Sequence, residues 1–78
     1  MLGDELRGER ERAGLSQQQV AAKAGITREY LSEVERENKS PTVKTLLRIC
    51  RAIGCSAGQV LVRVEASVGD SGKSGRSK

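Results

Sequence analysis

The stretch QQQVAAKAGITREYLSEVE, residues 17–35, holds two short helical patterns that meet at one glycine, Gly25. Val20 and Ala24 lie on one face of the first pattern, and Leu31 and Val34 lie on one face of the second. Only the residues AGIT, 24–27, join the two, so the chain has to turn sharply between them. We therefore expect two helices at a steep angle, and the corner between them decides the fold.

The composition favours helices throughout. The chain has 78 residues, a single domain of minimal size that buries only about 60% of the surface its unfolded chain exposes. Hydrophobic residues make up 36% of it and the one aromatic residue is Tyr30, so Leu, Val, Ile and Ala have to form the core. That composition suits packed helices better than a β-sandwich. We expect an all-α fold.

Three further segments extend the pattern to five short helices. The first, DELRGERERAG at 4–14, carries Leu6 at helical spacing, and Gly8 inside it costs about 1 kcal/mol relative to alanine. Residues 43–53 show the clearest apolar stripe. Residues 57–66 are ambiguous, because their valines fit either an alternating strand or a helical stripe, and we favour a helix. A serine or threonine is the predicted N-cap of four helices: Ser16, Thr27, Thr42 and Ser56.

These elements predict a compact all-α bundle of five short helices, with a helix-turn-helix, over residues 1–66. Residues 67–78 are rich in Gly, Ser and Lys, and we expect them to form a disordered tail. The chain has 14 Lys and Arg against 10 Asp and Glu, a net charge of +4 and a pI near 9.5. That balance favours an anionic partner.

Residues that carry catalytic or metal chemistry are scarce. Cys50 and Cys55 do not form a CxxC pair and the chain has no histidine, so a zinc site lacks ligands. No candidate nucleophile has a base beside it, so we expect neither an enzyme nor a bound cofactor or metal. No apolar run approaches the ~18 residues of a membrane span, and no signal peptide follows Met1. We expect a soluble, cytoplasmic protein with reduced thiols.

The corner at Gly25 has two interpretations. It is either an ordinary turn of a helical bundle or a device that presents the second helix to a ligand. Ala21 and Gly25 are small where the two helices cross, and Leu31 and Val34 face back into that crossing. The second helix then stands out as a ridge of polar side chains. Such a ridge fits the major groove of B-DNA, which is about 12 Å wide, and this favours DNA binding.

A family resemblance strengthens this interpretation. The spacing of Gln17, Ala21, Gly25, Leu31 and Val34, with GLSQ before it and SPTVKTLLRICRAIGCS after it, resembles the lambda repressor-like helix-turn-helix family. That family includes phage repressors, Cro proteins and XRE regulators. The resemblance covers about residues 2–62, most of the chain.

The resemblance implies that residues 16–24 position the domain on DNA and residues 27–36 form the recognition helix. Arg28 suits the two acceptors of guanine, and a glutamate suits the amino group of cytosine. Tyr30 is placed either to touch a thymine methyl group or sugar, or to pack between helices. The residues expected at base edges are Thr27, Arg28, Glu29 and Glu33. Those expected at phosphates are Ser16, Gln17, Arg36, Asn38, Lys39 and Lys44. For the charged residues, an ordinary solvated surface is the alternative.

The resemblance also implies an ion pair between Arg10 and Glu35 and a two-fold dimer. The expected dimer surface consists of Ile53, Val60, Leu61 and Val64, with simple closure of the core as the alternative. The sequence departs from the family at one place, where a glycine is common two residues after the position of Glu35. This chain has Glu37 there, followed by Asn38, which tolerates a left-handed conformation better. We therefore expect the recognition helix to run one residue further.

The sequence thus predicts a sequence-specific transcriptional regulator, most simply a repressor that binds a palindromic operator as a homodimer. The alternative is an antitoxin-type or adaptor-type protein-interaction module with secondary DNA binding, which the acid-rich recognition helix keeps open.

Overall fold

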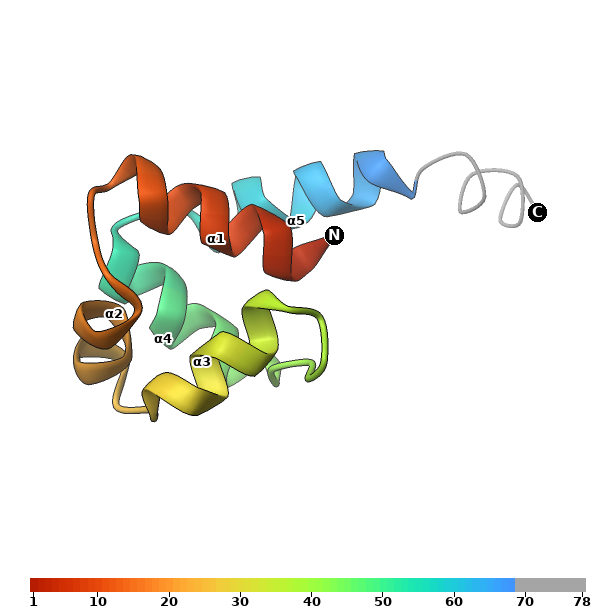
Figure 1. Ribbon diagram of the computed structural model, residues 1–78. Helices are drawn as coiled ribbons and strands as arrows, with labels where there is room; N and C mark the ends of the chain where they lie inside the picture. Colours follow the sequence, from red (N-terminus) through yellow and green to blue (C-terminus); the bar gives the residue numbers. More distant parts are fainter. Residues whose placement is uncertain (69–78) are drawn as a thin grey trace.

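A computed structural model describes residues 1–68 and shows five α-helices, with no strand in that range (Figure 1). The helices are α1 (Leu2–Arg12), α2 (Gln17–Ala24), α3 (Arg28–Glu35), α4 (Val43–Ile53) and α5 (Ala57–Ser67). The expected all-α bundle with a helix-turn-helix is therefore confirmed. Within the described residues, no single helix is long and apolar enough to cross a membrane. Helices α4 and α5 reach that length and composition only together, as a pair bent by 113°.

The ambiguous segment at 57–66 is a helix. Its N-cap is Ser56, whose hydroxyl oxygen accepts a hydrogen bond from the Gln59 amide at 3.2 Å. Val60 is fully buried, so one face of α5 packs on the core. The helix continues to Ser67, one residue beyond the boundary expected for the domain. The rest of the expected tail, from residue 69 on, lies outside the described residues.

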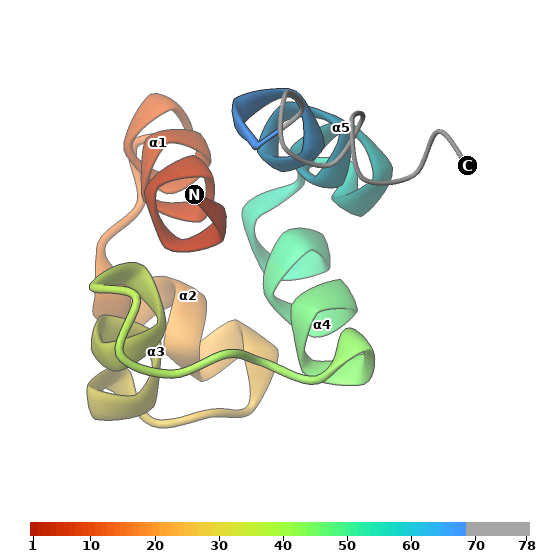
Figure 2. The ribbon, with the colours of Figure 1, turned by 90° about the vertical axis from the view of Figure 1, so that its right-hand side faces the viewer.

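The helices pack around one apolar core. Helix α2 packs against both α3 and α4, while α1 packs against α3, α4 and α5. Figure 2 shows α3 on one side of the molecule and α4 on the other, with α2 between them. The buried apolar residues are Leu6, Val20, Ala21, Ala24, Leu31, Val34, Leu46, Ile49, Cys50, Ile53 and Val60.

Hydroxyl caps fix where four of the helices begin. The side chains of Ser16, Thr27, Thr42 and Ser56 each accept a hydrogen bond from an amide in the first turn, at 3.0–3.2 Å. At Ser16 the bond is reciprocal, because its own amide donates to the Gln19 side chain at 2.8 Å. Such caps satisfy amides that have no partner within the helix, so these starts could be read from the sequence.

The two glycines of α1 have different surroundings. A Cβ atom on Gly3 would lie 2.4 Å from the Val34 carbonyl oxygen and 2.6 Å from that of Glu35. Only a glycine lets α1 approach the end of α3 this closely. A Cβ atom on Gly8 would meet only the flexible guanidinium group of Arg12, at 3.4 Å. Packing therefore requires Gly3 but not Gly8.

The expectation that α3 runs one residue further is wrong. The helix ends at Glu35, and the left-handed residue is Glu37, with φ 67°, rather than Asn38. The Glu37 amide donates to the Val34 carbonyl at 3.1 Å, and the Asn38 amide donates to the Glu33 carbonyl at 2.9 Å. These two bonds form a Schellman motif, which normally has glycine at the left-handed position.

The side chain of Glu37 gives a physical reason for this unusual choice. Its Oε2 atom accepts a hydrogen bond from the Asp4 amide in the first turn of α1, at 3.0 Å, and lies 3.3 Å from the terminal ammonium group of Met1. The start of α1 is a favourable place for a carboxylate. A glutamate at this position therefore joins the end of α3 to the start of α1, which glycine cannot do.

Candidate nucleic-acid interface

The turn between α2 and α3 fixes the orientation of α3, whose apolar side packs on the core. Gly25 ends α2 in a left-handed conformation with φ 73°, and the Ile26 amide donates to the Ala21 carbonyl at 3.0 Å. Leu31 and Val34 of α3 are buried beneath this turn. Because the apolar side of α3 is fixed in the core, its polar side faces outward as a ridge.

The first turn of α3 carries the most exposed of the expected base-contacting residues. The side chains of Arg28 and Glu29 are 47% and 79% exposed, and their charged ends lie 3.9 Å apart. Thr27 is also exposed, but its hydroxyl oxygen already accepts the Tyr30 amide as the helix cap. Tyr30 is half-buried and packs against the core, in agreement with the packing alternative. Arg28 and Glu29 are therefore the side chains best placed to meet a ligand.

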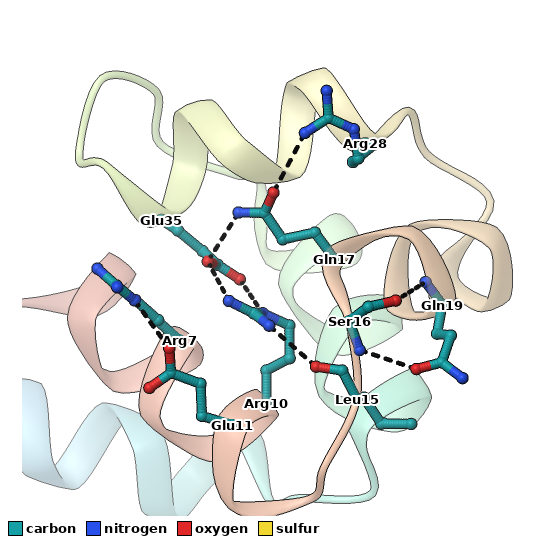
Figure 3. A network of polar contacts seen from close by, with 9 residues as sticks. All are labelled: Arg7, Arg10, Glu11, Leu15, Ser16, Gln17, Gln19, Arg28 and Glu35. Atoms are coloured by element: carbon teal, nitrogen blue, oxygen red, sulfur yellow. Dashed lines mark hydrogen bonds and ion pairs between the residues drawn. The ribbon is translucent and has the colours of Figure 1, made fainter.

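A buried ion pair lies behind this ridge (Figure 3). Arg10 of α1 donates from Nε to Oε2 of Glu35 at 2.7 Å and from Nη2 to Oε1 at 3.0 Å. Its Nη1 atom donates to the Leu15 carbonyl at 2.9 Å. The two charged side chains are only 11% and 3% exposed. The bonds to Glu35 raise the pKa of Arg10, and the pair fastens α1 to the end of α3.

Gln17 extends this network to the surface. Its amide nitrogen donates to Oε1 of Glu35 at 3.0 Å, and its amide oxygen accepts from Nη1 of Arg28 at 3.4 Å. Figure 3 shows the resulting path from α1 through Glu35 and Gln17 to Arg28. An amide nitrogen has two hydrogens, so one of them is still free to donate to a phosphate. The structure thus brings together Gln17 and Arg28, while the phosphate contact itself stays a prediction.

A second cluster closes the far end of α3. Glu33 accepts hydrogen bonds from the Asn38 side chain at 3.0 Å and from Arg36 at 2.8 Å. These two bonds, with Asn38 the larger influence, lower the pKa of Glu33. Glu33 was expected to contact bases, and Arg36 and Asn38 were expected to contact phosphates, but in the structure Glu33 binds both of them. Arg36 and Asn38 still have free N–H donors for a phosphate, whereas both carboxylate oxygens of Glu33 are already hydrogen-bonded.

The remaining candidates for phosphate contacts lie on either side of α3. Lys39 and Lys44 are exposed, in the loop before α4 and in its first turn, and neither forms an ion pair within residues 1–68. The hydroxyl group of Ser16 serves as the cap of α2. Of this group, the two lysines carry charge that the fold leaves unneutralised.

One residue of the ridge was missing from the predicted set. Ser32 lies four residues after Arg28 and four before Arg36, so it shares their side of α3. It is partly exposed. The four-residue spacing was visible in the sequence and would have included Ser32 among the residues that face a ligand.

The residues expected to form a dimer surface divide into two groups. Val60 is fully buried and Ile53 is buried at the edge of the core, so both close the fold of a single chain. For these two the core-closure alternative describes the structure. Leu61 is 46% exposed and Val64 is half-buried. Together with Val68, which directly follows α5, they form an apolar row at i, i+3 and i+7.

The chain is similar to known proteins over most of its length. A family model described as Helix-turn-helix matches residues 6–60. An HTH-type transcriptional regulator of Sinorhizobium fredii, y4dJ, is 38% identical over 56 residues, which cover 72% of this chain and 73% of that protein. Control protein C.SmaI of Serratia marcescens is 33% identical over 63 residues, covering 81% of this chain and 75% of that protein.

Solved structures agree with these sequence matches. The crystal structure of the clp gene regulator ClgR from Corynebacterium glutamicum superposes with a TM-score of 0.80 at 33% identity. The superposition covers 85% of this chain and 86% of that one. Some matching proteins are longer, and the chain spans 44% of the length of two HTH-type regulators from Mycobacterium tuberculosis.

Proposed function

We propose that this chain, which belongs to the helix-turn-helix family of DNA-binding transcriptional regulators, represses transcription by binding an inverted-repeat operator as a homodimer. The observation that carries this proposal is the path from Arg10 through Glu35 and Gln17 to Arg28. That path holds Gln17 against the core and places Arg28, the first exposed arginine of the recognition helix, beside it. A residue that reads a base benefits from such a positioned neighbour, because direct readout depends on hydrogen-bond geometry.

Arg28 is the residue we assign to a base. Its guanidinium group is half exposed and touches Gln17 only through a long hydrogen bond of 3.4 Å. Exchange of that bond for the two acceptors of guanine costs little, and the Gln17 amide then sits beside the DNA backbone. A good bidentate contact of this kind contributes about 1–3 kcal/mol of discrimination against other bases.

Glu29 contributes to specificity by a different route. Its carboxylate is the most exposed acidic group of the ridge and is repelled by phosphates. It is tolerated only where it accepts a hydrogen bond, for which the amino group of cytosine is suitable. Sites without such a partner are penalised, so Glu29 selects against wrong sequences.

Dimerisation is part of the proposal because one module of this size makes few contacts. Two recognition helices bind half-sites about 34 Å apart when the subunits are related by a two-fold axis. The apolar row of Leu61 and Val64 on α5 and Val68 directly after it supports this arrangement, since the row remains partly exposed in the single chain. Steric exclusion of polymerase from the promoter is then the simplest mechanism.

Selection of tight-binding duplexes from a random DNA pool tests this function. We expect an enriched inverted repeat with half-sites about 10 base pairs apart. On that duplex, Arg28→Ala removes one contact from each of the two half-sites, so it should weaken binding by about 30-fold or more, the equivalent of at least about 2 kcal/mol, and abolish the preference at one position of each half-site. Lys44→Ala should weaken binding to all sequences alike and reduce the dependence on salt.

The matched control is Arg7→Ala, which removes an exposed arginine that belongs to α1 and pairs with Glu11 rather than with a residue of the ridge. A uniform loss of affinity in Arg28→Ala would show that Arg28 contacts a phosphate instead. If no sequence is enriched and binding is weak, the operator-binding proposal fails. The adaptor or antitoxin alternative, in which the acid-rich ridge contacts a protein, then becomes the working hypothesis.

A further inference from the structure

The charges of the fold are strongly segregated. Residues 1–37 contain eight of the ten acidic residues, whereas residues 38–64 contain none. On α1 and α3, ion pairs neutralise most of the cations, as in the pairs that Arg12 forms with Glu9 and Arg36 forms with Glu33. Helix α4, by contrast, has Lys44, Arg48 and Arg51 and no acidic residue. The cationic surface of the described chain is therefore on the α4 side.

Part of this cationic surface surrounds a hollow. The α2–α4 hollow has a volume of about 450 Å³ and lies between the end of α2 and the second half of α4. Three cations line it, Lys23 from α2 and Arg48 and Arg51 from α4. Its apolar wall includes Ala22 and Ala52. Within residues 1–68, none of the three cations forms an ion pair or a side-chain hydrogen bond, and all three are exposed.

The position of the hollow separates it from the recognition ridge. Helix α2 packs against α3 on one side and α4 on the other (Figure 2). Arg48 and Arg51 lie on the side of α4 opposite its buried residues Leu46 and Ile49, so they point away from the core. No residue of α3 lines the hollow, and neither do Lys39 and Lys44, the two lysines expected at phosphates, so we expect a duplex seated on α3 to leave the hollow uncovered. A partner in the hollow can therefore be bound together with DNA.

We propose that the α2–α4 hollow is a docking site for an acidic segment of a partner protein. The segment has at least two carboxylates, with a small aliphatic side chain between them. Arginines bind carboxylates through paired, charge-assisted hydrogen bonds, which suits Arg48 and Arg51. The aliphatic group covers the alanines. A phosphodiester backbone matches the charge but offers no aliphatic side chain for this wall, so the hollow favours a polypeptide.

Repulsion between the cations of α4 also favours an acidic partner. Like charges three and four residues apart destabilise a helix, and the row of Lys44, Arg48 and Arg51 has both spacings. No acidic side chain within residues 38–64 offsets this repulsion. An acidic occupant offsets this repulsion, because its carboxylates neutralise cations that have no partner in the described fold.

The test uses an end-blocked peptide of alternating glutamates and valines, added to isotopically labelled full chain and followed by NMR. We expect saturable shifts at the amides of Lys23, Gly25 and Ala52, and binding that weakens as salt is added. The double variant Arg48→Glu/Arg51→Glu should weaken peptide binding by at least about tenfold, since two attractions become repulsions. A peptide with glutamines in place of the glutamates should not bind.

The matched control is Lys39→Glu, which reverses an exposed cation in the loop before α4, outside both the hollow and the cationic row of α4, and should change peptide affinity by less than about twofold. Lys39, Arg48 and Arg51 are all exposed, and a well-dispersed spectrum verifies that each variant is folded. If millimolar peptide causes no shifts around the hollow, or equal shifts in the variant with both arginines reversed, the docking site does not exist.

A duplex of random sequence distinguishes this site from the DNA surface. If the arginine variant loses as much duplex affinity as the lysine variant, the hollow belongs to the nucleic-acid surface and the proposal is overturned. If it keeps duplex affinity while losing the peptide, the two sites are separate, as we propose. Failure of the unmodified chain to bind any duplex would count against the proposed function and leave the peptide result unaffected.

Discussion

Replacement of Arg10 by alanine should remove much of the stability of this domain. The side chain donates two hydrogen bonds to Glu35, which is 3% exposed, and one to the Leu15 carbonyl. Without it, Glu35 keeps only the Gln17 amide as a side-chain partner in the described fold. Loss of one member of a buried pair costs about 3–5 kcal/mol, because the other charge is left uncompensated. A domain of this size has a free energy of unfolding of only about 4–12 kcal/mol.

Urea and thermal unfolding followed by circular dichroism measure this loss. We expect the melting temperature of Arg10→Ala to fall by about 12 °C or more. Arg7→Ala is the control on the same helix, because its pair with Glu11 is 60% and 56% exposed and should contribute less than about 0.5 kcal/mol. The double variant Arg10→Met/Glu35→Leu should recover most of the loss. Equal effects of Arg10→Ala and Arg7→Ala would refute the idea that the buried pair holds α1 to α3.

Three further predictions concern stability and reactivity. Gly3→Ala should lower the free energy of unfolding by about 1–3 kcal/mol, because a Cβ atom there meets backbone atoms of α3. Gly8→Ala should raise the free energy of unfolding by about 0.5–1 kcal/mol, because alanine favours the helix and meets no backbone there. Urea melts in which both substitutions have effects of the same sign would contradict this. Glu37→Gly should be more stable than Glu37→Ala by about 1 kcal/mol, because both lose the carboxylate and only glycine relieves the left-handed strain. Burial and, to a smaller extent, the neighbouring thiol of Cys55 raise the pKa of Cys50 to about 12. A thiol reagent should therefore modify Cys55 quickly and Cys50 only after unfolding. Fast modification of both thiols in the folded protein would argue against this packing.

The features that the sequence predicted correctly are those with local causes. A hydroxyl cap binds an amide three residues away, and an apolar stripe repeats within one helix, so the information lies within a few residues. The caps at Ser16 and Thr27 and the corner at Gly25 are of this kind. Residues 57–66 were ambiguous because their valines fit two periods. In the structure this segment is a helix, with Ser56 as its N-cap and Val60 buried in the core.

The features that the sequence missed depend on residues far apart in the chain. Glycine would relieve the strain at Glu37, but the carboxylate there bonds to the Asp4 amide, 33 residues earlier in the chain. Local preference favoured Asn38 for the left-handed position, and a contact between α1 and the end of α3 accounts for the glutamate. The need for Gly3 has the same origin, since only the folded chain shows that α3 lies against it.

The site residues show why stability and recognition are connected in this fold. In the sequence, Glu35 is one of three glutamates near the end of the recognition helix, and the family resemblance alone distinguished it. In the structure it accepts hydrogen bonds from both Arg10 and Gln17, and Gln17 in turn accepts from Arg28. The Glu35 carboxylate, which holds α1 to α3, thus also positions Gln17, and Gln17 contacts Arg28. Substitutions at Glu35 therefore change folding and base readout together, whereas Glu29, at 79% exposure, can change readout with little effect on folding.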